Sequence, residues 1–191
     1  MIKTIIGKKG SGKTTLTKHL INYRSKPAII VDLFNQFKGV RFFDVSSLLD
    51  YIIEGKLTIS QPVCISIFDQ DAFALLCEVV ITHKDLLFVV DEVDFFDSPS
   101  SQAREFKKMI HYSRHYSIDI ITTSRRPANI SRDLTSQTDA FSIFRITEKR
   151  DLDYFYALNA ELPEAIRALQ EHHYIEYDHD RIEVRNPISL A

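Results

Sequence analysis

The chain has 191 residues, of which 45% are hydrophobic, 11% aromatic and 26% charged, a composition that predicts one globular domain and excludes disordered and fibrous proteins. The formal net charge of −2 is too acidic for a protein that coats nucleic acid regardless of sequence. Contact with DNA would therefore need a local basic patch or many copies of the chain. Cys64 and Cys77 lie in apolar runs, which predicts buried free thiols in a reducing compartment.

Apolar runs typical of β-strands alternate with helix-like stretches along most of the chain. Strands are predicted at residues 2–7, 28–33, 40–45, 63–68, 85–92, 117–124 and 140–146. Helices are predicted between them at residues 13–23, 46–55, 69–83 and 98–116. Continuous apolar strands that alternate with helices are typical of a parallel sheet covered on both faces.

The final part of the chain changes character. Helices are predicted at residues 150–160 and 163–172, and "YIEYDHDRIEV" at 174–184 predicts a hairpin that turns at His179 and Asp180. No apolar run is long enough to span a membrane and no secretory signal precedes the first strand, so we expect a cytoplasmic protein without a membrane segment.

These elements predict one domain over residues 1–191. Its expected parts are a core at 1–150, C-terminal helices and a hairpin at 151–185, and a free tail at 186–191.

The stretch "GKKGSGKTT", residues 7–15, fits the pattern G-x-x-x-x-G-K-[ST] of a phosphate-binding loop between a strand and a helix. Its glycines let backbone N–H groups turn toward phosphate oxygens, and the following helix presents its positive end. Lys13 is predicted to reach the β- and γ-phosphates, and the Thr14 hydroxyl to coordinate Mg²⁺. We therefore expect ATP and Mg²⁺ as ligands. The nucleotide is expected to contact the whole loop: Gly7, Lys8, Lys9, Gly10, Ser11, Gly12, Lys13, Thr14 and Thr15.

Asp91 and Glu92 close the most apolar strand, "LLFVV". An acid at this place in a P-loop protein holds Mg²⁺, usually through water, which predicts a metal-binding role for Asp91. An adjacent glutamate can orient and deprotonate the attacking water, so Glu92 is the expected catalytic base. A base that activates water favours hydrolysis over transfer to another substrate.

The next strand ends in "TTSRRP", which places Thr123 and Ser124 at a strand end. Their hydroxyls are candidates for a contact with the γ-phosphate or with the attacking water. An ordinary polar strand end explains them equally well.

Arginines surround the same strand: Arg114 precedes it, and Arg125, Arg126 and Arg132 follow it. Surface arginines are usually solvated. An arginine that approaches the γ-phosphate of a neighbouring subunit would instead stabilise transition-state charge, an effect of about 10³-fold or more. This role requires a ring of subunits.

Other polar residues carry weaker signals. Asp32 ends a predicted strand and either faces the nucleotide or caps the strand. His111 and His115 lie four apart on a predicted helix without the glutamate of a zinc-protease motif, so packing or surface roles are expected. His172 and His173 receive no role.

With these features, the stretch "SRHYSIDIITTSRRPANISRDLTSQTDAFSIFRIT", residues 113–147, resembles the FtsK/HerA superfamily of P-loop ATPases. Arg114 matches the helix-end arginine of that pattern, and Ser124, Arg126 and Pro127 match its loop element. The chain departs from the family at Arg125, where members commonly carry a glutamine sensor. The resemblance covers residues 1–150 and leaves Thr123 or Arg125 as the expected sensor.

The resemblance implies an α/β fold of the RecA/ASCE-like P-loop NTPase class, with a mostly parallel sheet flanked by helices. It also implies a ring of about five or six subunits that hydrolyses ATP and translocates double-stranded DNA into a viral capsid. The expected catalytic residues are Glu92, Lys13 and, across the subunit boundary, Arg114. The expected sensors are Thr123, Ser124, Arg125 and Arg126. Capsid proteins are further expected partners, and the host cytoplasm or the virion is the expected location.

Two alternatives remain open. The zonula occludens toxin-like assembly ATPases of filamentous phages share the Arg-His pair before an Asp-Ile strand, although they normally carry a membrane segment. A small-molecule or nucleoside kinase shares the phosphate-binding loop and the length, and the basic cluster at 125–132 would then act as its lid.

Overall fold

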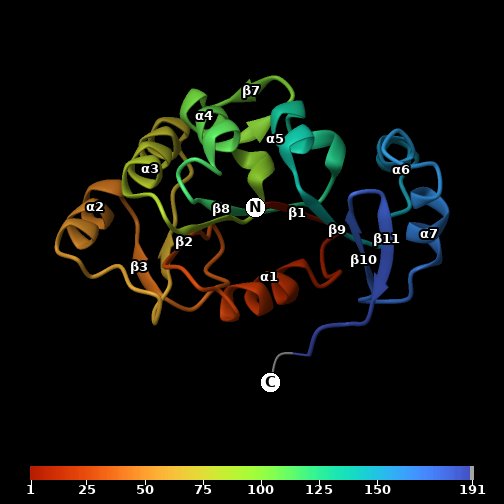
Figure 1. Ribbon diagram of the computed structural model, residues 1–191, viewed down its shortest axis with the longest axis horizontal. Coiled ribbons are helices and arrows are strands. Elements are labelled where there is room, and N and C mark those ends of the chain that lie inside the picture. The colour runs from red at the N-terminus through yellow and green to blue at the C-terminus, as the bar shows by residue number, and fades with distance from the viewer. Residues whose placement is uncertain (190–191) are drawn as a thin grey trace.

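A nine-stranded sheet forms the centre of the computed structural model, which describes residues 1–189 (Figure 1). Its strands are β1 (Ile2–Ile6), β2 (Ala28–Val31), β3 (Val40–Phe42), β4 (Val63–Ile65), β5 (Leu87–Val90), β8 (Asp119–Ser124), β9 (Ala140–Phe144), β10 (Tyr174–Asp178) and β11 (Arg181–Arg185). They are arranged in the order β11-β10-β9-β1-β8-β5-β2-β4-β3. All neighbouring pairs are parallel except β9 with β10 and β10 with β11. This arrangement confirms the expected fold class.

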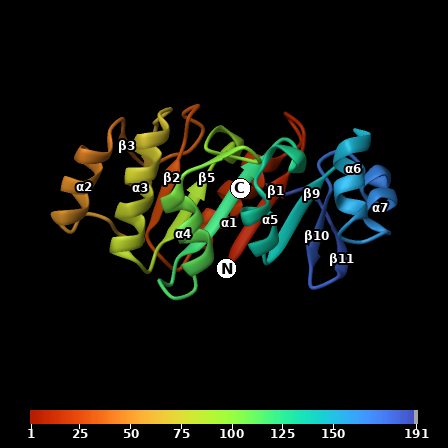
Figure 2. The same cartoon turned by 90° about the horizontal axis from the view of Figure 1, so that it is seen from above.

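Helices cover both faces of the sheet. They are α1 (Lys13–Asn22), α2 (Val45–Ile53), α3 (Gln70–His83), α4 (Arg104–Tyr112), α5 (Arg132–Gln137), α6 (Lys149–Tyr156) and α7 (Leu162–Ala168), with 3₁₀ turns η1 (Val93–Phe95) and η2 (Pro127–Asn129). Figure 1 shows α1 beneath the sheet and α3, α4 and α5 above it. Figure 2 shows α2 and α3 toward one end of the sheet and α6 with α7 at the other, beside β10 and β11.

The strands bury both faces, as their continuous apolar sequences predict. In β1, Ile2 and Ile6 belong to the larger core cluster, whereas Ile5 belongs to the smaller cluster with Leu16 of α1. Successive strand residues point to opposite faces, so a strand between two helical layers must be apolar at nearly every position. This requirement explains why runs of consecutive apolar residues in the sequence located the strands.

The predicted hairpin is also present and extends the main sheet. His179 and Asp180 form its turn with φ angles of 45° and 64°, the left-handed backbone of a two-residue hairpin turn. The hairpin is tied to the parallel strands by Glu176, which forms an ion pair with Lys3 and accepts a 2.8 Å hydrogen bond from Ser142 Oγ.

Two segments differ from the expectation. Within residues 98–116, where Ser/Pro start signals followed by a helix are predicted, the start of the stretch instead forms a small ribbon of β6 (Asp97–Ser98) and β7 (Ser101–Gln102) before α4. The buried Asp97 carboxylate causes this, because it accepts hydrogen bonds from Gln102 Nε2 at 2.6 Å and from the Ser131 N–H at 3.1 Å. The stretch between β8 and β9, for which no helix or strand is predicted, contains α5, whose start is capped by Ser131 Oγ, 3.1 Å from the Leu134 N–H.

Cys64 and Cys77 are buried free thiols, as predicted, and burial raises the pKa of Cys64 to about 11. Across residues 1–189, no helix has both the length and the apolar character needed to cross a bilayer.

Candidate active site

The loop between β1 and α1 requires glycine where it approaches β9. A Cβ atom at Gly7 would lie 2.7 Å from Phe144 Cβ and 2.6 Å from Ser11 Oγ, closer than real Cβ contacts. Gly12 has a φ of 114°, a backbone conformation that favours glycine. The loop therefore packs against β9 while its backbone turns into the start of α1.

Lys13 lies across this loop and is buried. Its Nζ donates to the carbonyl oxygens of Gly7 at 2.8 Å and Lys8 at 3.4 Å. Burial lowers the pKa of Lys13, and the nearby carboxylates of Glu92 and Asp91 counteract part of that shift. The ammonium group is thus held on the backbone of the loop, and in phosphate-binding loops the lysine at this position binds β- and γ-phosphate oxygens.

Asp91 and Glu92 are joined to the neighbouring strand through Thr123. The Thr123 hydroxyl donates to Asp91 Oδ1 at 2.7 Å and accepts from the Glu92 N–H at 2.9 Å. Asp91 is 3% exposed, and this burial raises the pKa of its carboxyl group, although the Thr123 hydrogen bond opposes the shift. Because β5 and β8 are parallel neighbours, their carboxyl ends bring these three residues together.

Glu92 adopts a left-handed backbone with a φ of 54°, which is uncommon for a residue other than glycine. Its Oε1 accepts a 3.1 Å hydrogen bond from Arg125 Nε. The Glu92 side chain is 13% exposed and that of Arg125 is 49% exposed, so the arginine covers the carboxylate from the solvent side.

These side chains meet in a cavity of about 700 Å³ at the carboxyl edge of the sheet, a volume in the range of small-molecule binding sites. The cavity is lined by Lys9, Gly10, Ser11, Gly12, Lys13, Thr14, Thr15, Phe34, Gln36, Glu92, Arg125, Phe144, His172, Pro187 and Ile188. Asp91 and Thr123 are buried next to the cavity-lining Glu92. The structure therefore brings the phosphate-binding loop, the acidic pair and one arginine into one site.

The oxygen donors at this site suit Mg²⁺, although no set of three or more His, Cys, Asp or Glu residues within 1–189 could hold a metal ion. Mg²⁺ is usually bound by one or two carboxylates together with substrate phosphates and water. Thr14 and Asp91 supply a hydroxyl and a carboxylate of that kind. Thr14 Oγ1 donates to Gln36 Oε1 at 3.0 Å, so its oxygen faces the cavity wall formed by the loop after β2.

Arg126 and Ser124 lie outside the cavity lining. Arg126 binds Asp151 through Nε at 3.1 Å and Glu148 through Nη2 at 2.6 Å, at the start of α6. Ser124 Oγ donates to the Arg126 carbonyl oxygen and accepts from the Arg126 N–H, which stabilises the turn after β8. Adjacent arginines thus point to different partners, Arg125 to the cavity and Arg126 to the C-terminal helices.

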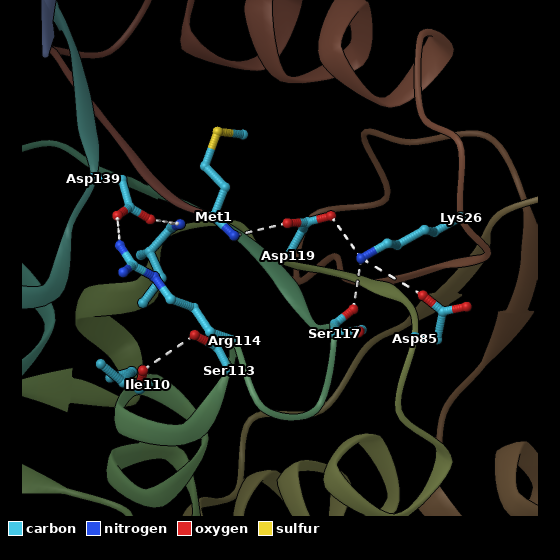
Figure 3. Close-up of polar contacts among 10 residues, drawn as sticks. Met1, Lys26, Asp85, Ile110, Ser113, Arg114, Ser117, Asp119 and Asp139 are labelled. Carbon is cyan, nitrogen blue, oxygen red and sulfur yellow. Dashed lines mark hydrogen bonds and ion pairs between the residues drawn. The ribbon is translucent and has the colours of Figure 1, made fainter.

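Arg114 lies at the opposite, amino edge of the sheet (Figure 3). It follows α4 and precedes β8, which runs from Asp119 to Ser124 and ends beside the cavity. Arg114 Nη2 donates to Asp139 Oδ1 at 2.5 Å, and the side chain is 79% exposed. The structure does not bring Arg114 to the cavity of its own chain.

Asp32 supports the cavity wall. Its buried carboxylate accepts from the N–H groups of Gln36 at 2.9 Å and Phe37 at 3.0 Å, and pairs with Arg41 at 2.7 Å. These contacts fix the turn that carries Gln36 toward Thr14. The carboxylate is thus engaged by protein groups, and Phe34 and Gln36 are the residues of this segment that line the cavity.

Sequence reasoning missed several lining residues: Phe34, Gln36, Phe144, His172, Pro187 and Ile188. Phe34 and Gln36 follow β2 and Phe144 ends β9, and these positions at strand ends could have drawn attention to them. No local pattern marks His172, whose Nδ1 lies 3.2 Å from the Ser11 carbonyl oxygen. Pro187 and Ile188 belong to the expected free tail, of which residues 190–191 lie outside the described part of the chain.

Comparison with known proteins gives structural similarity alone, since no family model and no curated protein matches the chain. The genome packaging NTPase B204 from Sulfolobus turreted icosahedral virus 2, in complex with ATP-gammaS, is similar with a TM-score of 0.82 and 20% identity over 98% of both chains. VirB4 of Thermoanaerobacter pseudethanolicus has a TM-score of 0.69 and 12% identity over 99% of this chain and 89% of that one.

The N-terminal domain of zonular occludens toxin from Neisseria meningitidis is more distantly similar. Its TM-score is 0.53 and its identity 15%, over 98% of this chain and 94% of that one. The similarities to B204 and VirB4 extend over almost the whole chain. The chain therefore has the P-loop NTPase fold that is also found in viral genome-packaging NTPases.

Proposed function

We propose that this chain is an ATP-hydrolysing motor that forms a ring and translocates double-stranded DNA, as in viral genome packaging. The observation that carries the proposal is the shared cavity of Lys13, Thr14 and Glu92, with Asp91 and Thr123 buried beside it. A phosphate-binding lysine and an acid able to activate water in one site suit hydrolysis of a nucleoside triphosphate.

Each of these residues has a defined part in the proposed reaction. Water attacks the γ-phosphorus of ATP, the bond from that phosphorus to the bridging oxygen of ADP breaks, and Glu92 accepts the proton of the water. Lys13 stabilises negative charge on the β- and γ-phosphate oxygens. The Thr123 hydroxyl positions both the backbone of Glu92 and the Asp91 carboxylate through its two hydrogen bonds.

Thr14 and Asp91 are the residues proposed to hold Mg²⁺. The ion would neutralise negative charge on the phosphates when it is bound.

Among the four sensor candidates, the geometry supports Arg125 most strongly. Its Nε contacts Glu92 Oε1 and its side chain lines the cavity. Negative charge on a γ-phosphate would compete with Glu92 for this guanidinium. Thr123 acts beside it as the support of the acidic pair, whereas Ser124 and Arg126 hold the turn and the start of α6.

The motor part of the proposal rests on Arg114 and on the similarity to B204. An exposed guanidinium at the edge opposite the cavity suits action on a neighbouring subunit in a closed ring. The protein named as a genome packaging NTPase has the same fold over nearly the whole chain. Capsid proteins and DNA are the proposed partners on this basis.

The decisive test replaces Glu92 with Gln and measures ATP turnover with and without long duplex DNA. We expect turnover to fall by about 10²- to 10⁴-fold, because the variant keeps the shape of the side chain but loses the base. ATP binding should persist. Glu164→Gln, on the exposed surface of α7, is the matched control and should hydrolyse ATP like the parent.

Equal turnover of Glu92→Gln and the parent would remove the base from the mechanism. If duplex DNA does not change the ATP turnover of the parent, the chain can still be an ATPase, but the proposal that it is a DNA motor is contradicted.

A second candidate is a nucleotide-dependent assembly ATPase, favoured by the similarity to the zonular occludens toxin domain. Sedimentation with nucleotide distinguishes the two, since a ring that ignores DNA favours the assembly role. A kinase receives less support. In the basic cluster at 125–132, Arg125 and Arg126 bind carboxylates, and the guanidinium of Arg132 lies 5.6 Å from the centre of the Tyr154 ring. Each of these arginines is thus engaged within the fold, unlike the arginines of a mobile kinase lid.

A further inference from the structure

The cavity has two chemically different ends, and the strand order separates them. The phosphate-binding loop follows β1. On one side of it, β8 and β5 carry Arg125 and Glu92. On the other side, β9 ends at Phe144, and His172 lies just before β10. In the proposed reaction the γ-phosphate lies next to Glu92, so the rest of a bound nucleotide would extend toward the Phe144 side or out of the cavity.

The Phe144 side offers a rigid aromatic support. Phe144 is 2% exposed, and its ring centre lies 5.3 Å from that of Tyr174. Its edge is so near the loop that a Cβ at Gly12 would be 3.1 Å from Phe144 Cε1. His172 stands beside it, with its Nδ1 3.2 Å from the Ser11 carbonyl oxygen and half of its side chain exposed.

The segment after β11 completes this wall. Figure 1 shows the chain leaving β11 and running beneath the sheet toward α1. Ile188 packs against the core cluster that contains Leu16, Phe144 and Tyr174, which anchors the segment. Pro187 is exposed and lines the cavity together with Ile188. Ile188, anchored on this core cluster, thus holds the exposed apolar ring of Pro187 at the rim of the site.

We propose that Pro187, Ile188 and His172 form the subsite for the nucleobase of the bound triphosphate. A planar heterocycle is the part of a nucleotide that gains from stacking and apolar contact, and the phosphates are already matched by the opposite end of the cavity. The segment after β11 is therefore part of the nucleotide site. The inference rests on nucleotide binding at the loop, as in the proposed function.

The test compares a ligand that has a base with one that has none. The variant is the double substitution Pro187→Gly and Ile188→Ser in the full chain. The control is Val184→Ser, which removes an exposed apolar side chain of β11 outside the cavity. Calorimetric titrations with ATP and with inorganic tripolyphosphate, both with Mg²⁺, give the two dissociation constants.

We expect the double variant to bind ATP about tenfold more weakly, equivalent to about 1.4 kcal/mol, because the base loses its wall. Its affinity for tripolyphosphate should stay within about twofold of the parent, because the loop is unchanged. His172→Asn tests the same wall from the other segment, and asparagine tolerates the φ of 61° at this position. It should weaken ATP but not tripolyphosphate.

Three outcomes overturn the subsite. They are unchanged ATP affinity in both variants, an equal loss for ATP and tripolyphosphate, and a matching loss in Val184→Ser. If the parent binds neither ligand, the proposed function fails together with the subsite. If the parent binds both and Lys13→Ala weakens both, phosphate binding at the loop stands whatever happens to the subsite.

Discussion

At the two edges of the central sheet, the pKa values of aspartate carboxyl groups shift in opposite directions. At the carboxyl edge, burial raises the pKa of Asp91. At the amino edge, burial also acts on Asp119 and Asp139, but hydrogen bonds outweigh it and both pKa values are lowered. The ionised form of Asp91 therefore destabilises the folded chain, whereas the ionised forms of Asp119 and Asp139 stabilise it.

The difference follows from the partners at each edge. Asp119 binds the Met1 α-ammonium at 2.8 Å and Lys26 at 3.0 Å, and Asp139 accepts from the Ile2 N–H and from Arg114 (Figure 3). Asp91 receives one hydroxyl, from Thr123, and lies near Lys13 without an ion pair to it. A site that must bind phosphate and metal keeps its polar groups free for the ligand, so the stabilising contacts are made at the other edge.

The largest effect is expected for Arg114, which lies at the amino edge of one subunit and is proposed to act at the carboxyl edge of the next. Arg114→Ala should lower ATP turnover of the assembled protein by about 10³-fold if this guanidinium completes the next subunit's site. Stability should change by less than about 1 kcal/mol, because the pair with Asp139 is exposed. Steady-state turnover and urea unfolding measure the two quantities.

Asp139→Asn is the control, because it disrupts the same ion pair but keeps the arginine. It should retain most of the parent turnover. Parent-like turnover in Arg114→Ala would confine this arginine to its contact within the chain and contradict the role between subunits.

A smaller effect, of about 1 kcal/mol, is expected for Asp91→Asn, and it is stabilising. The folded-state pKa of Asp91 lies above the ordinary value of 3.8, so the unfolded chain releases its proton first. As pH rises from below that value, the parent loses stability relative to the variant, and the difference levels off above the folded-state pKa. Urea unfolding at several pH values measures it, while ATP turnover should collapse.

A destabilised Asp91→Asn at neutral pH would contradict the assignment of this acid as a buried charge kept for function. Thr123→Val provides the complementary comparison, because it removes the hydroxyl that satisfies Asp91.

The smallest effect is expected at the amino edge. Asp119→Asn should lower stability at neutral pH by less than about 1 kcal/mol, since its partners are partly exposed. The folded-state pKa of Asp119 lies below 3.8, so its contribution is present above that value and is lost as pH falls through the folded-state pKa. The same unfolding series should thus give a difference of opposite sign to that of Asp91→Asn; equal signs would remove the contrast between the edges.

Much of the fold could be predicted because its signals are local. Continuous apolar strands, the loop at 7–15 and the turn at His179 and Asp180 each depend on residues close in sequence. The ribbon before α4 escaped prediction because the buried Asp97 binds Ser131, a partner far along the chain.

The candidate site divides in the same way. Lys13, Thr14, Asp91 and Glu92 could be named from sequence because a short motif dictates their chemistry. The different contacts of Arg125 and Arg126 could not be predicted. The two arginines are adjacent and chemically identical, and they differ only in the carboxylates that they bind.

By itself the sequence determined the parallel α/β sheet, the phosphate-binding loop and the acidic strand end, because each is encoded by residues that are adjacent or regularly spaced. Only the tertiary structure decided that Arg114 lies at the edge away from its own cavity, and that His172, Pro187 and Ile188 return to the loop. These placements depend on the strand order, in which β9 lies beside β1 and the hairpin lies beside β9, although most of the chain separates β1 from both. Contacts between distant segments are set by packing of the whole core, which no local pattern records.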